Sequence, residues 1–350
     1  MKRIHLALVS SGVIWLVAGC GGGYSTAYTD TTIPTAAVQI TTANAPAVAK
    51  GAVAPAQSMT NTGSGMVGVV GVVAQTHMRS RSIRDIALAD FNRARGLKFS
   101  PAAAGAIASL TLPCTTSGTV SVSFQDTDSS TTFTVGDVLI MAFNNCVEPT
   151  TATENGSTTN GSMTFAITSA NGPLQFGAAT GTSGAPFTAS FTLTFSYFTS
   201  KDNVTNLTDS INGDISFSTS DNGTNTTGTM SGTSLRMDNS ADGAFLMTNY
   251  SFSFTEANVV TTTSPYSFSV NMTIASVVAN GSVTITTPTP FTGQGGGNPT
   301  AGVMVITGAN NSNLTLTALS DGVNVQLVVD EDGTVGPIVP ATINTTWAAI

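Results

Sequence analysis

The stretch DTDSSTTFTVGD, Asp126–Asp137, spaces oxygen-bearing residues in a way that suits a hard cation. Counted from its first residue, positions 1, 3, 5, 9 and 12 carry a carboxylate or a hydroxyl, and position 7 offers a main-chain carbonyl. Calcium is held by oxygen ligands of these kinds. The expected metal ligands are Asp126, Asp128, Ser130, Thr132 and Asp137. The alternative interpretation is a solvated acidic hairpin loop that binds no metal.

This spacing resembles the calcium loops of EF-hand and dockerin proteins, where oxygens on alternate residues surround one cation. The resemblance implies calcium as a cofactor. The stretch departs from those loops because Thr131 replaces the turn glycine and because the flanking segments are predicted strands. Both departures predict weak binding. A second acidic turn, Asp330–Thr334, is shorter and offers fewer ligands.

Two cysteines bracket the acidic stretch. In an exported chain, the oxidising compartment favours a disulfide between Cys114 and Cys146, and two buried thiols are the alternative. The segments between them, Gly118–Phe124 and Gly136–Asn145, suggest a hairpin whose outer ends this bond would join. Closing such a loop is expected to stabilise the fold by roughly 3–4 kcal/mol in the chain-entropy picture.

This chain contains few residues that are suited to catalysis, so we expect that it is not an enzyme and has no catalytic residues. Apart from a histidine in the apolar N-terminal run, the only histidine is His77, which precedes the predicted β domain. Paired carboxylates for glycoside hydrolysis remain open, because such pairs meet only in space. Beyond Lys98 the only basic residues are Lys201 and Arg236. Nucleic acid is therefore a poor partner, because binding its phosphates requires a basic surface, which this chain lacks beyond Lys98.

The N-terminus has the architecture of an export signal. Lys2 and Arg3 precede a mostly apolar run, Ile4–Val17, which is too short to span a bilayer of ~30 Å comfortably as a helix. The following VAGC, Val17–Cys20, resembles the lipobox of bacterial lipoproteins. That resemblance implies cleavage before Cys20, a diacylglycerol thioether on it and acylation, for example by palmitate. It implies an outer-membrane lipoprotein, facing either the periplasm or the cell surface.

Composition divides the chain into four regions. Residues 1–19 are the signal peptide, 20–75 a lipidated flexible tether, 76–109 a basic amphipathic helix with its linker, and 110–350 an antiparallel β domain. The helix prediction rests on Arg79–Lys98, which holds six of the chain's eleven basic residues and has apolar positions at helical spacing. This helix would bind either anionic lipid or the acidic β domain itself.

Beyond residue 110, apolar side chains recur at every second position, as in half-buried strands. Three runs show this alternation, and within each run the apolar residues are predicted to face the same way. The runs are Phe191, Leu193, Phe195 and Tyr197; Phe268, Val270, Met272 and Ile274; and Val323, Val325, Leu327 and Val329. Asn-Gly and Asp-Gly pairs, which favour two-residue hairpins, occur at 160–161, 171–172, 212–213, 242–243, 280–281 and 321–322. The predicted fold is all-β, an antiparallel meander curled into a barrel, half-barrel or sandwich.

The cysteines around an acidic loop, with the ending VQLVVDEDGTVGPIVPATINTTWAAI, also resemble a group of uncharacterised all-β bacterial lipoproteins. That resemblance supplies no activity. Two non-catalytic functions therefore compete. One is a structural or adhesive module whose Thr, Ser and Asn faces contact glycan or envelope protein. The other is a carrier that holds a lipid or another hydrophobic ligand in a half-barrel.

The lipid anchor can be tested directly. A Cys20→Ser variant should remain uncleaved and should lose labelling by radioactive palmitate, because the thioether needs the cysteine sulfur. The measurement is gel autoradiography of labelled cells that express the full chain. Equal labelling of variant and wild type would contradict the anchor.

Overall fold

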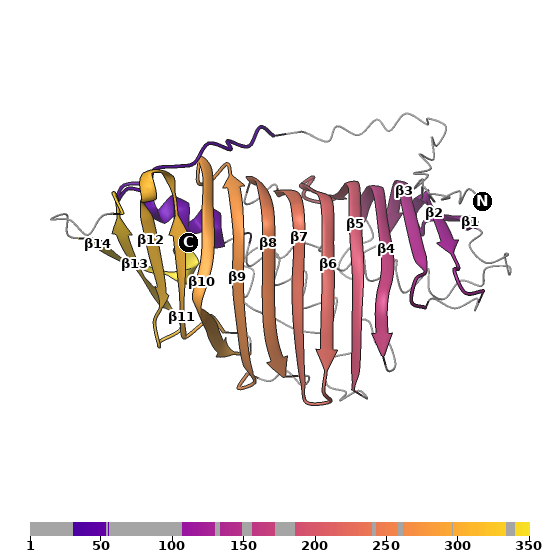
Figure 1. Ribbon diagram of the computed structural model, residues 1–350. Coiled ribbons are helices and arrows are strands. Elements are labelled where there is room, and N and C mark those ends of the chain that lie inside the picture. Colours follow the sequence, from indigo (N-terminus) through magenta and orange to yellow (C-terminus); the bar gives the residue numbers. More distant parts are fainter. Residues whose placement is uncertain are drawn as a thin grey trace, which may run out of the picture.

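The computed structural model describes residues 31–53, 55, 107–129, 134–148, 156–171, 186–239, 243–257, 262–295, 297–333 and 340–350. Within them, fourteen strands form one sheet in chain order, each antiparallel to the next (Figure 1). The predicted all-β antiparallel meander is confirmed. The first and last strands do not pair with each other, so this sheet is open and is not the closed barrel among the predicted forms.

The strands are longest in the middle of the sheet. The first three are β1 (Ile107–Pro113), β2 (Ser117–Gln125) and β3 (Val138–Glu148). The middle ones are β4 (Ser157–Asn171), β5 (Phe187–Asp202), β6 (Thr208–Asp221), β7 (Asn225–Asn239), β8 (Gly243–Ala257), β9 (Pro265–Ser276) and β10 (Gly281–Gln294). The last are β11 (Ala301–Thr307), β12 (Asn313–Ala318), β13 (Asn324–Asp330) and β14 (Ala341–Thr346), with short 3₁₀ helices η1 (Ala309–Asn311) and η2 (Trp347–Ala349).

One face of the sheet, here called the inner face, carries the apolar side chains. The predicted run from Phe268 to Ile274 is buried at every second residue, as expected. Rings on neighbouring strands stack along this face: Phe191 lies 5.0 Å from Phe165 and 4.9 Å from Phe217 between centroids. Each such aromatic pair stabilises the sheet by about 0.5–1.5 kcal/mol beyond the area it buries.

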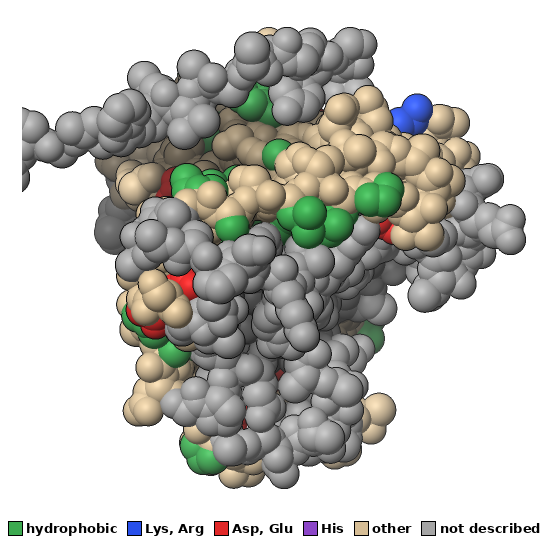
Figure 2. Space-filling model, turned by 90° about the vertical axis from the view of Figure 1, so that its right-hand side faces the viewer, with side chains coloured by type: hydrophobic (Ala, Val, Ile, Leu, Met, Phe, Trp, Pro, Cys, Tyr) green, Lys and Arg blue, Asp and Glu red, His purple; other side chains and the backbone are tan. Residues whose placement is uncertain are grey.

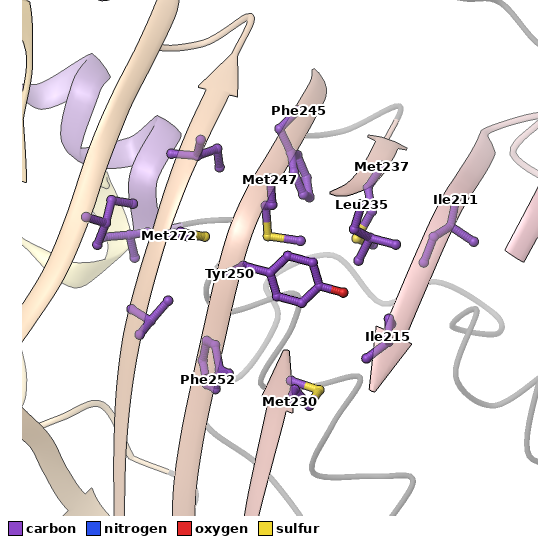
Figure 3. Close-up of a cluster of buried hydrophobic side chains, with 14 of the residues drawn as sticks. Ile211, Ile215, Met230, Leu235, Met237, Phe245, Met247, Tyr250, Phe252 and Met272 are labelled. Atoms are coloured by element: carbon purple, nitrogen blue, oxygen red, sulfur yellow. The ribbon is translucent and has the colours of Figure 1, made fainter. Parts of the chain in front are cut away.

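Methionine fills much of the remaining interior. Figure 3 shows Tyr250 of β8 lying among Met230, Met237 and Met247, all of which are buried. The Tyr250 hydroxyl donates a hydrogen bond to the main-chain carbonyl of Asp214, which satisfies its one polar group. Burial, and then the negative charge of Asp214, raise the pKa of Tyr250. Flexible thioethers suit this irregular space around a ring.

The alternation in β5 changes phase near its upper end in Figure 1, and this corrects the predicted direction of one side chain. Tyr197 was expected to point inward with Phe195, but it is 64% exposed, and Phe198 is buried instead. The reason is a β-bulge, visible as a register shift between Phe195 and Phe198 against β6. Tyr197 itself adopts a φ of 47°. The extra residue moves every later side chain to the other face.

Two of the predicted hairpin turns lie inside strands. Asn160-Gly161 lies within β4 and Asn212-Gly213 within β6, so neither is a turn. Each pair serves a bulge on the preceding strand. The side-chain oxygen of Asn160 accepts the Asn145 N–H at 2.7 Å, and that of Asn212 accepts the Tyr197 N–H at 3.2 Å. The asparagines thus satisfy main-chain donors that the bulges remove from the ladder.

Other turn predictions agree better with the structure. The β9–β10 connection ends at Asn280, and the β12–β13 turn contains Asp321 and Gly322. In the predicted C-terminal run, Val325, Leu327 and Val329 are buried. Val323, however, precedes β13 and is 56% exposed, because it belongs to the turn and not to the strand.

Residues 31–53 differ from the predicted flexible tether, because they dock on the C-terminal part of the sheet. Ser282 of β10 donates its N–H to Ala36 at 2.9 Å and accepts the Val38 N–H at 3.1 Å. A helix over residues 45–53 follows, and one of its faces is almost fully buried: Ala45, Val48, Ala49, Ala52 and Val53. Figure 1 shows this helix behind β10 to β12. Flexible linkers and stable helices can both be rich in alanine, so composition alone did not distinguish them for this segment. The packing of its apolar side chains against the sheet favours the helix.

An acidic turn holds this segment in place. Thr42 donates both its N–H and its hydroxyl to one carboxylate oxygen of Glu331, at 2.8 and 2.9 Å. These hydrogen bonds lower the pKa of Glu331. The second acidic turn of the sequence therefore has a structural use here. The basic helix predicted within 76–109 lies outside the described residues, and so does the signal peptide.

The bulge glycines should be intolerant of a side chain. Gly161 has a φ of 91°, and a Cβ there would overlap the main chain of Tyr197. We expect Gly161→Ala to lower the free energy of unfolding by about 2 kcal/mol or more, measured by urea denaturation. Gly297→Ala is the control, because it would meet only ordinary contacts. Equal stability of the two variants would contradict the role of the bulge.

Candidate functional site

The outer face of β4 to β9 carries ordered rows of small polar side chains. Strand register aligns one residue from each of the six strands in every row. The three rows are Asn171–Thr188–Ser220–Thr227–Thr255–Ser267, Ser169–Ser190–Ser218–Thr229–Ser253–Ser269 and Ala166–Thr192–Ser216–Ser231–Ser251–Asn271. We call these eighteen positions the hydroxyl grid. It holds no charged residue.

The grid is regular because the backbone makes it so. Neighbouring strands lie about 4.8 Å apart, and successive residues on one face lie about 6.8 Å apart along a strand. All its side chains are exposed or half-buried. Some hydroxyls pair within a row: Ser253 and Ser269 are 2.7 Å apart, and Ser190 and Ser218 are 3.2 Å apart. A hydroxyl can donate once and accept twice, so a paired one keeps capacity for a ligand.

A hollow of about 1000 Å³ adjoins the grid at the lower edge of the sheet in Figure 1. Grid residues Thr255 and Ser267 form part of its lining, and residues 297–300 and 320–322 contribute from two neighbouring connections. The rest is mainly amide, hydroxyl and glycine main chain, including Asn225, Gln294 and Asn298. Pro265, Tyr266 and the carboxylate of Asp321 also line it, so the hollow offers hydrogen-bonding groups together with apolar surface.

Hydrogen bonds stiffen the wall of this hollow. The Asn298 amide donates to the Gly322 carbonyl at 2.9 Å, which joins the two connections. Asp321 accepts the N–H groups of Val323 and Asn324 at 2.9 and 2.8 Å. These bonds lower the pKa of Asp321, the only carboxylic acid among the lining residues that the structure describes. It is consequently a carboxylate at neutral pH.

The predicted calcium loop brings three of its five expected ligands together. Carboxylate oxygens of Asp126, Asp128 and Asp137 lie within 4.8 Å of one another. Ser130 and Thr132 lie outside the described residues. Asp126 and Asp137 are buried, so this loop differs from a solvated acidic turn.

Asp137 organises this loop through hydrogen bonds. One of its carboxylate oxygens accepts the N–H and hydroxyl of Thr127, at 2.8 and 2.9 Å. The other accepts the N–H and hydroxyl of Thr134, at 2.7 and 2.9 Å. The Thr134 hydroxyl also lies 3.0 Å from a carboxylate oxygen of Asp128, and its single proton can serve only one of the two acids at a time. Asp137 therefore accepts three or four hydrogen bonds, and a calcium ion must compete with them. The calcium site stays a prediction.

The predicted cysteine pair lies at the opposite end of the same hairpin. Cys114 and Cys146 form a disulfide, with Cα atoms 5.5 Å apart. It joins the residue that follows β1, in the connection to β2, to a residue near the end of β3, as the spacing predicted. Next to it, Thr115 donates its N–H to Glu148 at 3.2 Å. Cys20 and His77 lie outside the described residues.

Comparison with protein-family models, curated proteins and solved structures finds no match to this chain. In the part of the chain that the structure describes, no helix combines the length and apolar character needed to cross a membrane. Function must therefore be argued from the site itself.

The sequence alone pointed to the acidic loop, but not to the grid or the hollow. Alternating Thr192 and Thr194 beside buried residues indicated a polar outer face. Rows appear only when the register of six strands is known. The connection at 293–298 has the composition of a flexible turn, yet Asn298 and Gly297 are hydrogen bonded within the wall of the hollow.

Calcium binding by the loop would show as a stability change. At about 10 mM calcium, a site with an affinity of ~10⁻⁴–10⁻³ M should stabilise the native chain by about 1.4–2.7 kcal/mol. The measurement is the thermal midpoint of the full chain in calcium and in chelator at matched ionic strength. Asp126→Asn with Asp128→Asn should abolish the shift, and Asp202→Asn at another turn should keep it. An unchanged wild-type midpoint would show that the loop binds no calcium.

Proposed function

We propose that this chain is a non-catalytic binding module of the bacterial cell envelope that contacts neutral glycan through the hydroxyl grid and the adjoining hollow. The single observation that carries this proposal is the uncharged grid of eighteen aligned positions, fifteen of them Ser or Thr. Sugars present hydroxyls that both donate and accept hydrogen bonds. The grid offers the same chemistry over an extended surface.

The energetics favour an extended ligand over a single sugar. A net hydrogen bond in water contributes only about 0.5–1.5 kcal/mol, and exposed hydroxyls already bond to water. One sugar on the grid would therefore bind weakly. A polymer or a glycan layer engages many positions at once, and the later contacts become intramolecular. The hollow, which is open to solvent, gives such a ligand one concave point of attachment.

Lipidation at Cys20 would place this module on the outer membrane. The support is the order of basic residues, apolar run, small residues and cysteine in the first twenty residues. Several acyl chains would make the attachment nearly permanent. A module held at a surface meets its ligand in two dimensions, so weak contacts to glycan suffice.

The carrier alternative has less support. The apolar side chains of the inner face are mostly below 3% exposure, packed as a core is. Most residues that line the hollow are polar or glycine, and polar and apolar atoms share its surface about equally. Native mass spectrometry distinguishes the two functions, because a carrier would retain a hydrophobic ligand through purification.

The grid hydroxyls can be removed without changing side-chain shape. We expect Thr227→Val, Thr229→Val and Thr255→Val together to weaken binding by about tenfold or more, since valine keeps strand preference but cannot hydrogen bond. The measurement is co-sedimentation of the full chain, in detergent, with cellulose, chitin or peptidoglycan sacculi. Raising the salt concentration should change binding to cellulose or chitin little, because these polymers carry no net charge to screen.

The matched control replaces outer-face threonines outside the grid: Thr284→Val, Thr286→Val and Thr307→Val. This variant should bind as wild type does. Two results would overturn the proposal. One is that none of the three polysaccharides sediments the wild-type chain. The other is that the grid variant and its control bind equally.

A further inference from the structure

Tyr197 has a backbone conformation that its residue type disfavours. Its φ of 47° lies in the left-handed region, where the Cβ of an L-residue crowds the main chain. Among the residues that the structure describes, eight residues other than glycine have a positive φ, of which six are asparagine and one is serine. The eighth is Tyr197. Such outliers cost free energy, and they cluster at binding and catalytic sites.

The same kind of bulge occurs in three strands, and only one of them carries an aromatic residue at the left-handed position. The register shifts around Asn145 in β3, Tyr197 in β5 and Asn249 in β8, and in each case the next residue along the chain is buried. The φ of Asn145 is 46° and that of Asn249 is 47°. Asparagine is the residue that best tolerates this region after glycine. The bulge therefore needs a left-handed residue, but it does not need a tyrosine.

Neighbouring strands fix the main chain of Tyr197 from both sides. A Cβ on Gly161 of β4 would come within 2.2 Å of the Tyr197 carbonyl oxygen, so only glycine fits there. On the β6 side, the Asn212 side chain accepts the Tyr197 N–H at 3.2 Å. The Tyr197 side chain is nevertheless 64% exposed. A ring on a fixed main chain loses less freedom than one on a mobile loop when a ligand packs against it.

The ring lies among small polar side chains of the outer face. Tyr197 continues the β5 column of the hydroxyl grid, about 16 Å along the strand from Thr192. Ser196 precedes it at the surface, and register sets Ser162 of β4 opposite Ser196. Figure 2 views the molecule from the β1 end, and charged side chains are few among the described residues on that side. The ring and these hydroxyls offer apolar and hydrogen-bonding surface side by side.

We infer that Tyr197 is a stacking residue of the glycan site, against whose ring one sugar of a polysaccharide packs while other sugars bind the hydroxyl grid. This inference rests on the proposed function and adds a defined contact to it. A sugar ring carries C–H groups on its faces and hydroxyls at its rim. The C–H groups match the electron-rich face of tyrosine, and the rim matches the neighbouring hydroxyls.

Stacking supplies a driving force that the hydroxyls lack. Exposed hydroxyls exchange water for sugar with little net gain in free energy. An aromatic ring that packs on a sugar removes apolar surface from water, and this favours binding.

A lipid surface is the alternative occupant, since exposed tyrosines also gather at membrane interfaces. The charges of this chain oppose that alternative. Its net charge is −8, and Asp214 of β6 lies opposite Thr194 of β5, on the strand that carries Tyr197. Negative charge is repelled by the anionic surface of a membrane. An uncharged polysaccharide meets no such repulsion.

Tyr197→Asn separates binding from folding, because asparagine is the residue at the other two bulges. We expect the thermal midpoint of this variant to equal or exceed that of the wild type. Its co-sedimentation with cellulose, chitin or peptidoglycan sacculi should weaken by about tenfold. Tyr197→Phe keeps the ring and should recover most of the binding that Tyr197→Asn loses. Val204→Asn is the matched control, because Val204 is 52% exposed but lies in the β5–β6 connection, and it should bind as the wild type does.

The full chain is measured in detergent, beside the grid variant Thr227→Val, Thr229→Val and Thr255→Val. If Tyr197→Asn binds as the wild type does while the grid variant binds weakly, the stacking role is overturned and the proposed function stands. If the wild type sediments with none of the polysaccharides, both fail. If Tyr197→Asn keeps its polysaccharide binding but less of it fractionates with cell membranes, the ring belongs to a lipid contact, which also overturns the inference.

A spectroscopic measurement reports on the contact itself. Tyr197→Trp places an indole on the outer face, whereas Trp347 is buried. Soluble oligosaccharides of the polysaccharide that sediments the wild type should shift the fluorescence of this variant to shorter wavelength, because the indole leaves water. The fluorescence of the wild type should not shift. An equal response of the two proteins would refute stacking at this position.

Discussion

The antiparallel register of the middle strands is the constraint on which the rest of this structure depends. Because side chains alternate between the two faces of a strand, a shift of the strand register by one residue would exchange the apolar face for the hydroxyl face. The bulges in β3 and β5 make such a shift, and they do so where Asn160 and Asn212 can accept the displaced main-chain donors. The same strand register therefore produces both the apolar core and the hydroxyl grid, and a change of register would alter both.

An open sheet must also finish its two ends, and this chain treats them unequally. The segment over 31–53 is connected to the far end of the sheet by its bonds to Ser282 and Glu331. That contact brings a helix to the C-terminal strands and completes their core. The strand at the other end keeps its leucine exposed.

The acidic loop shows how spacing and structure supply different information. Alternate oxygens around Asp126 are compatible with a cation, and folding does bring three carboxylates together. The same folding gives Asp137 the N–H and hydroxyl of Thr127 and the N–H of Thr134, and it places the Thr134 hydroxyl between Asp137 and Asp128. A loop with a carboxylate so well satisfied can be ordered without metal. Spacing alone could not distinguish these cases, because hydrogen-bond partners are chosen in three dimensions.

The sequence by itself determined the strand class, the antiparallel meander, the position of the cysteine pair and the inward direction of Phe191 and Leu193. These follow from local periodicity, turn chemistry and chain connectivity, which act over a few residues. Tertiary structure decided that Tyr197 points outward, that Gly161 lies within a strand and not in a turn, that residues 31–53 dock on the sheet and that the hydroxyls align into rows. Each of these depends on contacts between distant segments, whose free energies outweigh local preference.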